Sequence, residues 1–210
     1  MLRLVTLILA GALICIGALV SVVKVASLQQ QEDREVVLNA QLLSLKKEPQ
    51  TPQTNEKIVD TYLQLRKLSE AMTILQERWK FLAAHWKTAD HAEFCRVAAK
   101  LAAVYADRGN FDHALDVEDI RLQYDKRLHG ENSPEVARDF NNQALCLYLK
   151  GTTMTEPRDR KMYFRSAIKA LETSNSIWKE LKSDRSDFNI ANNKKLEQLA
   201  RRDLVSSRLN

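Results

Sequence analysis

The chain has 210 residues, of which 45% are hydrophobic and 28% are charged, so it is long enough to bury the core of one modest domain. Its formal net charge is +5, and its basic residues are interleaved with acids nearly throughout; no basic run with interleaved aromatic residues occurs, which argues against a nucleic-acid-binding groove. Five glycines and four prolines are few for this length, and the composition predicts an all-α fold.

The first predicted element is an apolar helix at the N-terminus. Leu4 to Val23 contains no charged residue, and its length is about the 20 residues that a helix needs to cross a bilayer. A cleaved signal peptide is the alternative, but the run is long for a signal and Lys24 stands three residues before the best cleavage site. We therefore expect residues 1–26 to form a single-pass membrane anchor, with the soluble part outside the cytoplasm.

Residues 27–54 are predicted to form a helical stalk and a linker. Residues 27–47 are rich in glutamine, glutamate and leucine, with a partly helical pattern of apolar residues. Residues 46–54 hold two prolines, Pro49 and Pro52, and no aliphatic residue, which is typical of a connection between folded parts. The folded domain is therefore expected to span residues 55–210.

Two segments of the same kind, 101–109 and 143–151, end at Gly109 and Gly151, which lie 42 residues apart. A period of this length is typical of stacked helix pairs, with each glycine at the turn between two helices. A first repeat fits at a spacing of 43, with Arg66 in place of the glycine, and the second helix of the third repeat is delayed by an insertion at 152–161. A final helix over 187–204 is expected to cap the array.

The segment from Leu128 to Ala137 and the run Asn141-Asn142-Gln143-Ala144-Leu145 resemble the tetratricopeptide repeat, in the 42-residue form of kinesin light chains. The resemblance implies a right-handed α-solenoid of about three repeats plus a capping helix. Glu118 and Arg121 depart from the family, which prefers an aromatic residue and an alanine at these positions.

The resemblance also implies a concave groove that binds a peptide or protein partner. By position in the repeat, the groove is expected to include Lys57 and Asp60 of the first repeat and Ala103 of the second. Such a groove would be basic and rich in amides, which suits acidic side chains and peptide backbone. The other predicted groove residues, on the second and third repeats, are Arg96, Lys100, Arg138, Asn141, Asn142 and Tyr148.

No catalytic motif occurs in the sequence, so we expect no enzyme activity and no cofactor. The strongest metal-binding pattern is His91 and Cys95, four residues apart, with His85 upstream; this is short of a full ligand set, and we expect no metal site. Asp90 is expected to cap a helix, Cys95 and Cys146 to be buried free thiols, and the three tryptophans to pack in the core or between repeats.

Together these features predict a membrane-tethered adaptor or scaffold that grips a protein partner in its groove. A membrane-anchored, chaperone-like factor for secreted clients is one alternative, and it differs by binding many clients. A structural protein that associates with itself is the other.

Overall fold

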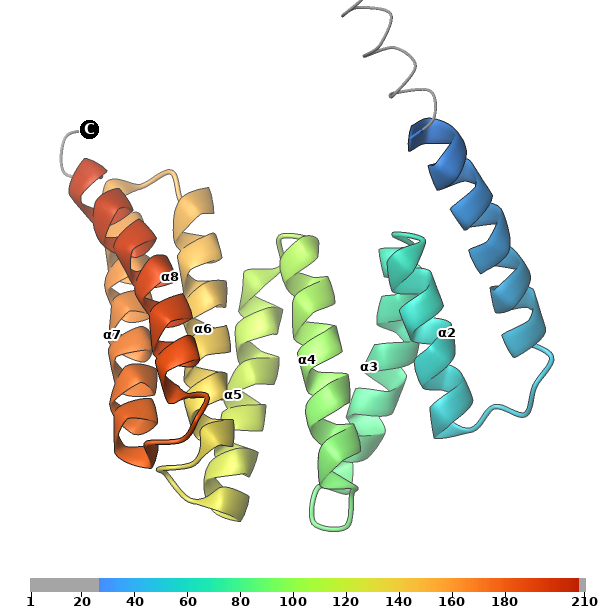
Figure 1. Ribbon diagram of the computed structural model, residues 1–210, viewed down its shortest axis with the longest axis horizontal. Helices are drawn as coiled ribbons and strands as arrows, with labels where there is room; N and C mark the ends of the chain where they lie inside the picture. Colours follow the sequence, from blue (N-terminus) through green and yellow to red (C-terminus); the bar gives the residue numbers. More distant parts are fainter. Residues whose placement is uncertain (1–26, 208–210) are drawn as a thin grey trace, which may run out of the picture. The chain divides into compact units, whose positions relative to one another are not determined.

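The computed structural model describes residues 27–207, and every regular element in this range is an α-helix (Figure 1). The predicted membrane span lies outside these residues, and none of the described helices is long and apolar enough to cross a membrane. The chain divides into two compact units, Met1–Ala71 and Met72–Asn210. A helix over residues 27–45 comes first, followed by α2 (Pro52–Gln64), α3 (Leu68–Ala84), α4 (His91–Asp107), α5 (Phe111–His129), α6 (Pro134–Thr153), α7 (Pro157–Leu181) and α8 (Ser186–Ser206).

In the first unit the predicted stalk packs as part of the fold. Leucines 38, 42 and 45 form one stripe of the helix over 27–45, and all three are buried. Lys67 Nζ donates a hydrogen bond to Asn39 Oδ1 at 3.1 Å, which ties this helix to the end of α2. α2 starts at Pro52 because Thr51 Oγ1 accepts from the backbone N–H of Thr54. The connection between these two helices covers residues 46–51, and the boundary between the compact units falls after Ala71.

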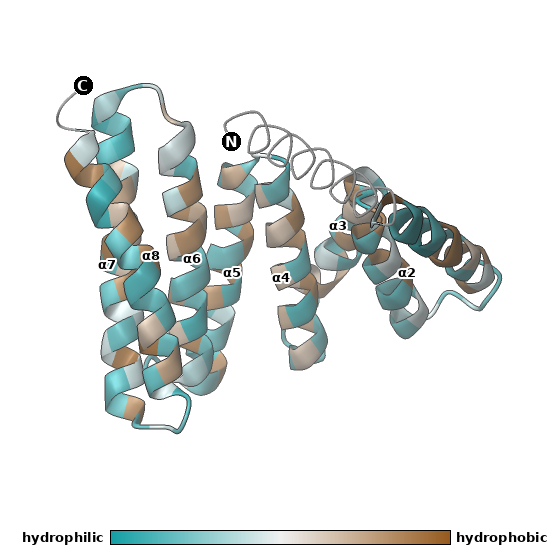
Figure 2. Ribbon diagram, turned by 45° about the horizontal axis from the view of Figure 1, so that its top comes forward, coloured by the Kyte–Doolittle hydropathy of each residue, from teal (hydrophilic) through white to brown (hydrophobic). Residues whose placement is uncertain are grey.

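The second unit is a series of antiparallel helices in which each helix from α4 to α8 packs against the next (Figure 1). Each helix carries both hydrophobic and hydrophilic residues, as Figure 2 shows, because one face is turned to its neighbours. α3 is tied to α4 by a bidentate ion pair from Arg78 to Glu93, with nitrogen–oxygen distances of 2.6 and 2.7 Å. α8 packs on α7 and agrees with the predicted capping helix to within two residues.

Burial recurs along the chain at the predicted spacings. Val59, Ala102 and Ala144 are all buried, and they are separated by 43 and 42 residues. The chain is therefore a helical repeat protein in the described residues, and buried apolar positions recur on the first helix of each repeat.

The turns of the first two repeats have the same backbone geometry. Gly109 adopts a φ of +73°, as predicted for a glycine that ends a helix, and Arg66 adopts a φ of +56° at the corresponding position. The residue after each one donates a backbone hydrogen bond to the carbonyl of a tyrosine five residues earlier, Tyr62 or Tyr105, at 2.9 and 2.8 Å. Arg66 thus takes over the left-handed position that glycine fills in the second repeat.

Gly151 does not make a turn, so that prediction is wrong. It lies inside α6, and a Cβ atom at this position would be 2.7 Å from Cε1 of Phe164. The glycine is needed because α7 approaches α6 too closely for a side chain.

The insertion at 152–161 has a regular structure. It lengthens both α6 and α7 and leaves only residues 154–156 as the connection, where Arg160 donates to the carbonyl of Met154.

Candidate functional site

A cavity of about 420 Å³ lies between α4, α5 and α6 in the second unit. α4 and α6 are the first helices of successive repeats, where the resemblance to tetratricopeptide repeats places the groove. The cavity combines basic, acidic and amide side chains, so it is suited to a polar ligand. Its lining consists of His91, Ala92, Cys95, Arg96, Ala99, Arg121, Asp125, Glu135, Arg138, Asp139 and Asn142.

Three of the predicted groove residues meet in this cavity. Arg96 lies on α4, and Arg138 and Asn142 lie one turn apart on α6. Lys100 follows Arg96 by one turn of α4 and is half-buried, but it is not part of the lining.

Two more of the predicted groove residues contact α8. Asn141 donates a hydrogen bond to Asn193, and the Tyr148 hydroxyl donates to Asp203 Oδ2 at 2.9 Å. Asn193 is itself buried and donates to Ser174 and Asn175 of α7. Asn141 and Tyr148 thus help to hold α8 against the repeat array.

The charge of the cavity differs from the basic groove that the sequence predicts. At its mouth Arg96 is exposed, and Arg138, whose side chain is 60% exposed, forms an ion pair at 2.8 Å with Glu135, which also lines the cavity. Its floor holds the buried carboxylates of Asp125 and Asp139 beside the buried guanidinium of Arg121. A ligand therefore meets both basic and acidic groups, with Arg96 and Arg138 among the exposed ones.

The floor belongs to a buried charge network on α5 and α6. Arg121 Nε donates to Asp139 Oδ1 at 2.7 Å, and Arg121 Nη2 lies 2.7 Å from Glu118 Oε2. The side chains of all three are at most 5% exposed. Glu118 Oε2 and Asp139 Oδ2 accept no hydrogen bond from any described residue, so their contacts are mainly electrostatic.

Sequence analysis missed this network, although a signal for it was present. Glu118 and Asp125 occupy positions that the preceding repeat fills with Leu75 and Leu82, 43 residues earlier. Together with Arg121 they follow the spacing i, i+3, i+7, which places them on one face of α5. Polar residues on α5 at the positions where the preceding repeat has buried leucines predict a buried polar cluster.

Burial raises the pKa of both carboxylates that Arg121 contacts. The pKa of Glu118 rises to about 7, since the attraction of Arg121 offsets only part of the burial and Asp119 and Asp125 add repulsion. Burial also raises the pKa of Asp139 to about 8, with Arg121 again opposing the shift and Asp125 adding to it. One guanidinium therefore does not keep the surrounding carboxylates fully ionised at neutral pH.

These shifts predict that the second unit loses stability as the pH rises from 5 to 8. Glu118 and Asp139 bind protons more tightly in the folded state, so their contribution is full below the unfolded pKa values, near 4, and is lost as the pH passes about 7 and 8. We expect a loss of about 1–3 kcal/mol in the free energy of unfolding. Urea unfolding at pH 5 and pH 8 measures it. Glu118→Gln should reduce the difference, and the exposed control Glu77→Gln should not; an equal pH response in all three proteins contradicts the assignment.

The two described cysteines are free thiols, as predicted, although Cys95 is only half-buried. Burial raises the pKa of each to about 12, and nearby carboxylates act in the same direction, Asp125 on Cys95 and Glu118 on Cys146. A thiol with such a pKa is a poor nucleophile.

Asp90 caps α4 as predicted, because its carboxylate accepts from the backbone N–H of Glu93 at 2.7 Å.

The tryptophans behave in two ways. Trp178 is buried in a core cluster, and the ring of Trp79 lies 4.9 Å from that of Phe94, so both pack as predicted. Trp86 instead lines a second cavity of about 330 Å³, with an apolar lining that includes Tyr124 and Ile120. Its lining also includes Asp119, Gln123 and Arg127, but the first cavity has more polar side chains and remains the stronger candidate for a binding site.

No protein-family model matches the chain, and no curated protein matches it. Among solved structures, the chain is similar to the crystal structure of BtubC (BKLC) from P. vanneervenii, at 15% sequence identity and a TM-score of 0.44. The match covers 87% of this chain and 78% of that one. Similarity at this level supports no inference about function. The helical repeat architecture rests on the helix pairs and the recurring burial described above.

Proposed function

We propose that the chain is a membrane-tethered interaction module of the tetratricopeptide type, which binds a segment of a protein partner in the cavity between α4, α5 and α6. The observation that carries the proposal is the convergence of Arg96, Arg138 and Asn142 at one cavity formed by successive repeats. The uncharged run from Leu4 to Val23 supports the tether. The proposal places the soluble part outside the cytoplasm, by analogy with other chains that have an N-terminal anchor and one domain.

The cavity favours a partner segment with acidic side chains. The guanidinium groups of Arg96 and Arg138 stand at the mouth and form charge-assisted hydrogen bonds with carboxylates. The Asn142 amide supplies both a donor and an acceptor for a peptide unit. A membrane tether raises the effective concentration of a partner at the same membrane, so modest contacts suffice.

The proposed role involves no catalysis. The raised pKa of Cys95 leaves the cysteine that lines the cavity protonated at neutral pH, which is unfavourable for nucleophilic chemistry. The charges of the cavity serve recognition in this account.

Crosslinking in intact cells, followed by mass spectrometry, tests the proposal. The native chain is compared with a variant carrying Arg96→Glu and Arg138→Glu, and with a control carrying Lys169→Glu and Lys179→Glu. The control makes the same charge change at exposed positions of α7. We expect one or a few partners that disappear only in the first variant. Crosslinks that survive in it contradict the proposal, and crosslinks to many unrelated clients favour the chaperone-like alternative.

Self-association is a second candidate function, and exposed apolar residues favour it. Val36, Val37 and Leu43 on the helix over 27–45 are each more than 60% exposed, on a helix whose other face is buried. An exposed apolar patch of this kind is typical of an interface. Analytical ultracentrifugation of the chain in detergent tests it: Val36→Lys with Leu43→Lys should abolish any oligomer, and an oligomer that persists rules this helix out as the interface.

A further inference from the structure

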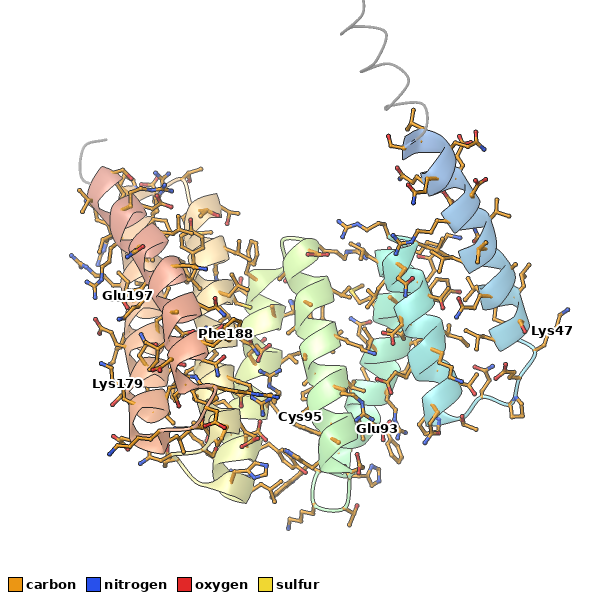
Figure 3. All side chains as sticks on the ribbon, viewed as in Figure 1. Lys47, Glu93, Cys95, Lys179, Phe188 and Glu197 are labelled. Atoms are coloured by element: carbon orange, nitrogen blue, oxygen red, sulfur yellow. The ribbon has the colours of Figure 1, made fainter. Side chains whose placement is uncertain are left out.

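Two pairs of ligand-bearing side chains meet where α4 begins and α5 ends. His91 is the first residue of α4 and Cys95 follows one turn later, near the same end of the helix (Figure 3). Asp125 and His129 are likewise four residues apart and belong to the last turn of α5. Residues at i and i+4 share a helix face, and α4 and α5 are antiparallel neighbours. The hairpin therefore brings both pairs together.

The distances between the ligand atoms are those of a metal site. His91 Nε2 lies 3.0 Å from His129 Nε2 and 3.6 Å from Asp125 Oδ1, and His129 Nε2 lies 4.0 Å from the same oxygen. A triangle with these edges has its centre about 2.1 Å from each corner, within the usual range of zinc–nitrogen and zinc–oxygen bonds. The three atoms thus surround one point at bonding distance.

Cys95 supplies a further group beside this point. Its Sγ lies 3.8 Å from His91 Nε2 and 3.7 Å from Asp125 Oδ1, and Cys95 also lines the cavity. The bond lengths of a tetrahedral zinc site place two nitrogen ligands about 3.3 Å apart, and a sulfur and a nitrogen ligand about 3.6 Å apart. Cys95 is therefore placed to complete the coordination.

We propose that His91, Asp125 and His129 bind a Zn²⁺ ion, with the Cys95 thiolate as the fourth ligand. Imidazole, carboxylate and thiolate together suit zinc better than calcium or magnesium, which take oxygen ligands. Coordination of Cys95 releases its thiol proton to solvent, and the zinc–sulfur bond replaces the sulfur–hydrogen bond.

The surroundings hold the ligands in place. The ring of Tyr124 stacks on that of His91 at 5.4 Å, and Asp125 is buried, with its side chain only 3% exposed. The two histidine side chains are each 31% exposed, so an ion can enter from solvent. The ion would join the start of α4 to the end of α5 at one end of the cavity, and it would stabilise the helix pair that carries Arg96.

His85, the upstream histidine of the sequence pattern, is not part of this group. Its ring stacks on Phe81, and its Nδ1 lies 2.8 Å from the Phe81 carbonyl oxygen. The sequence pattern thus held two of the four ligands, and the other two come from the end of the next helix.

A simple hydrogen bond between the imidazoles of His91 and His129 is the competing explanation for the short distance between their Nε2 atoms.

Metal titration of the purified full-length chain in detergent distinguishes these explanations. After treatment with a chelator, the chain is titrated with Zn²⁺ by calorimetry and with Co²⁺ by absorption. We expect one Zn²⁺ per chain with a Kd of about 1 µM or tighter. Co²⁺ should give the visible bands of a tetrahedral site and a thiolate-to-cobalt charge-transfer band. Zn²⁺ should also raise the Tm of the chain.

Matched variants decide the assignment. His91→Ala and His129→Ala should each weaken zinc binding at least tenfold, and Cys95→Ser should abolish the charge-transfer band. His113→Ala is the control, since His113 lies on α5, is exposed and contacts Asn110 instead. Circular dichroism checks that each variant folds. Absence of one-to-one binding, binding that survives either histidine variant, or equal weakening by His113→Ala overturns the proposal.

Discussion

Arg121→Met is expected to destabilise the second unit by about 3–5 kcal/mol at pH 7, the largest effect of any single substitution considered. Arg121 is the cation between Glu118 and Asp139, and the side chains of all three are buried. Without the guanidinium these carboxylates must either stay charged in a dry environment or take up protons. Urea unfolding of the purified chain measures the loss, which should be smaller at pH 5 because protonation of Glu118 and Asp139 is then easier.

Arg127→Met is the matched control for this prediction. Arg127 lies on the same helix, but it is exposed and contacts the ring of Trp86 at 5.4 Å. The control should cost less than about 1 kcal/mol. Combining Arg121→Met with Glu118→Leu and Asp139→Leu should recover much of the stability, because an apolar replacement of the network leaves fewer buried charges without a partner. Equal effects of Arg121→Met and Arg127→Met would contradict the buried network.

Gly151→Ala is expected to destabilise the chain by up to about 2 kcal/mol, although alanine is the better helix former. The new methyl group would lie 2.7 and 2.8 Å from two ring atoms of Phe164 and 3.2 Å from Cβ of Tyr163. Phe164 is only 1% exposed, so its ring has no free space to move into. The overpacking penalty of about 1–3 kcal/mol should outweigh the gain of about 1 kcal/mol in helix propensity. Thermal or urea unfolding measures the net effect.

A double-mutant cycle isolates the contact behind this prediction. Phe164→Leu removes part of the ring and is destabilising by itself, but Gly151→Ala should cost less in its presence. Thr152→Ala, at an exposed position of the same helix, should be nearly neutral. If Gly151→Ala stabilises the native chain, the close approach of α6 and α7 is not real.

The sequence predicted the repeat architecture because the apolar pattern and the turn residues act locally. Spacings of 42 and 43 residues located the buried faces of the first helices, and Gly109 has the left-handed conformation that its position required. Gly151 was misjudged since two different constraints select glycine: a left-handed backbone at a turn, and a close approach within a helix. At Gly151, only the packing of α7 on α6 shows which of these two constraints applies.

The candidate site was predicted in part for a similar reason. Arg96, Arg138 and Asn142 were found from the repeat register, which fixes the face of a helix. Asn141 and Tyr148 were assigned to the groove because the position of α8 depends on contacts far apart in the sequence. The ligand cluster of His91 and His129 arises between helices, and no window along one helix contains it. The acidic floor is of both kinds, because Arg121 and Asp125 share one face of α5 whereas Asp139 comes from α6.

Site-specific photo-crosslinking most directly tests the central claim that the cavity binds a protein segment. A photoreactive residue replaces Asn142 in the cavity, and in a second chain it replaces Lys169, an exposed position on α7. Both chains are illuminated in cells, and the crosslinked peptides are identified by mass spectrometry. Our account predicts a discrete partner peptide rich in acidic residues at position 142 and none at position 169. The same products at both positions, or none at position 142, would contradict it.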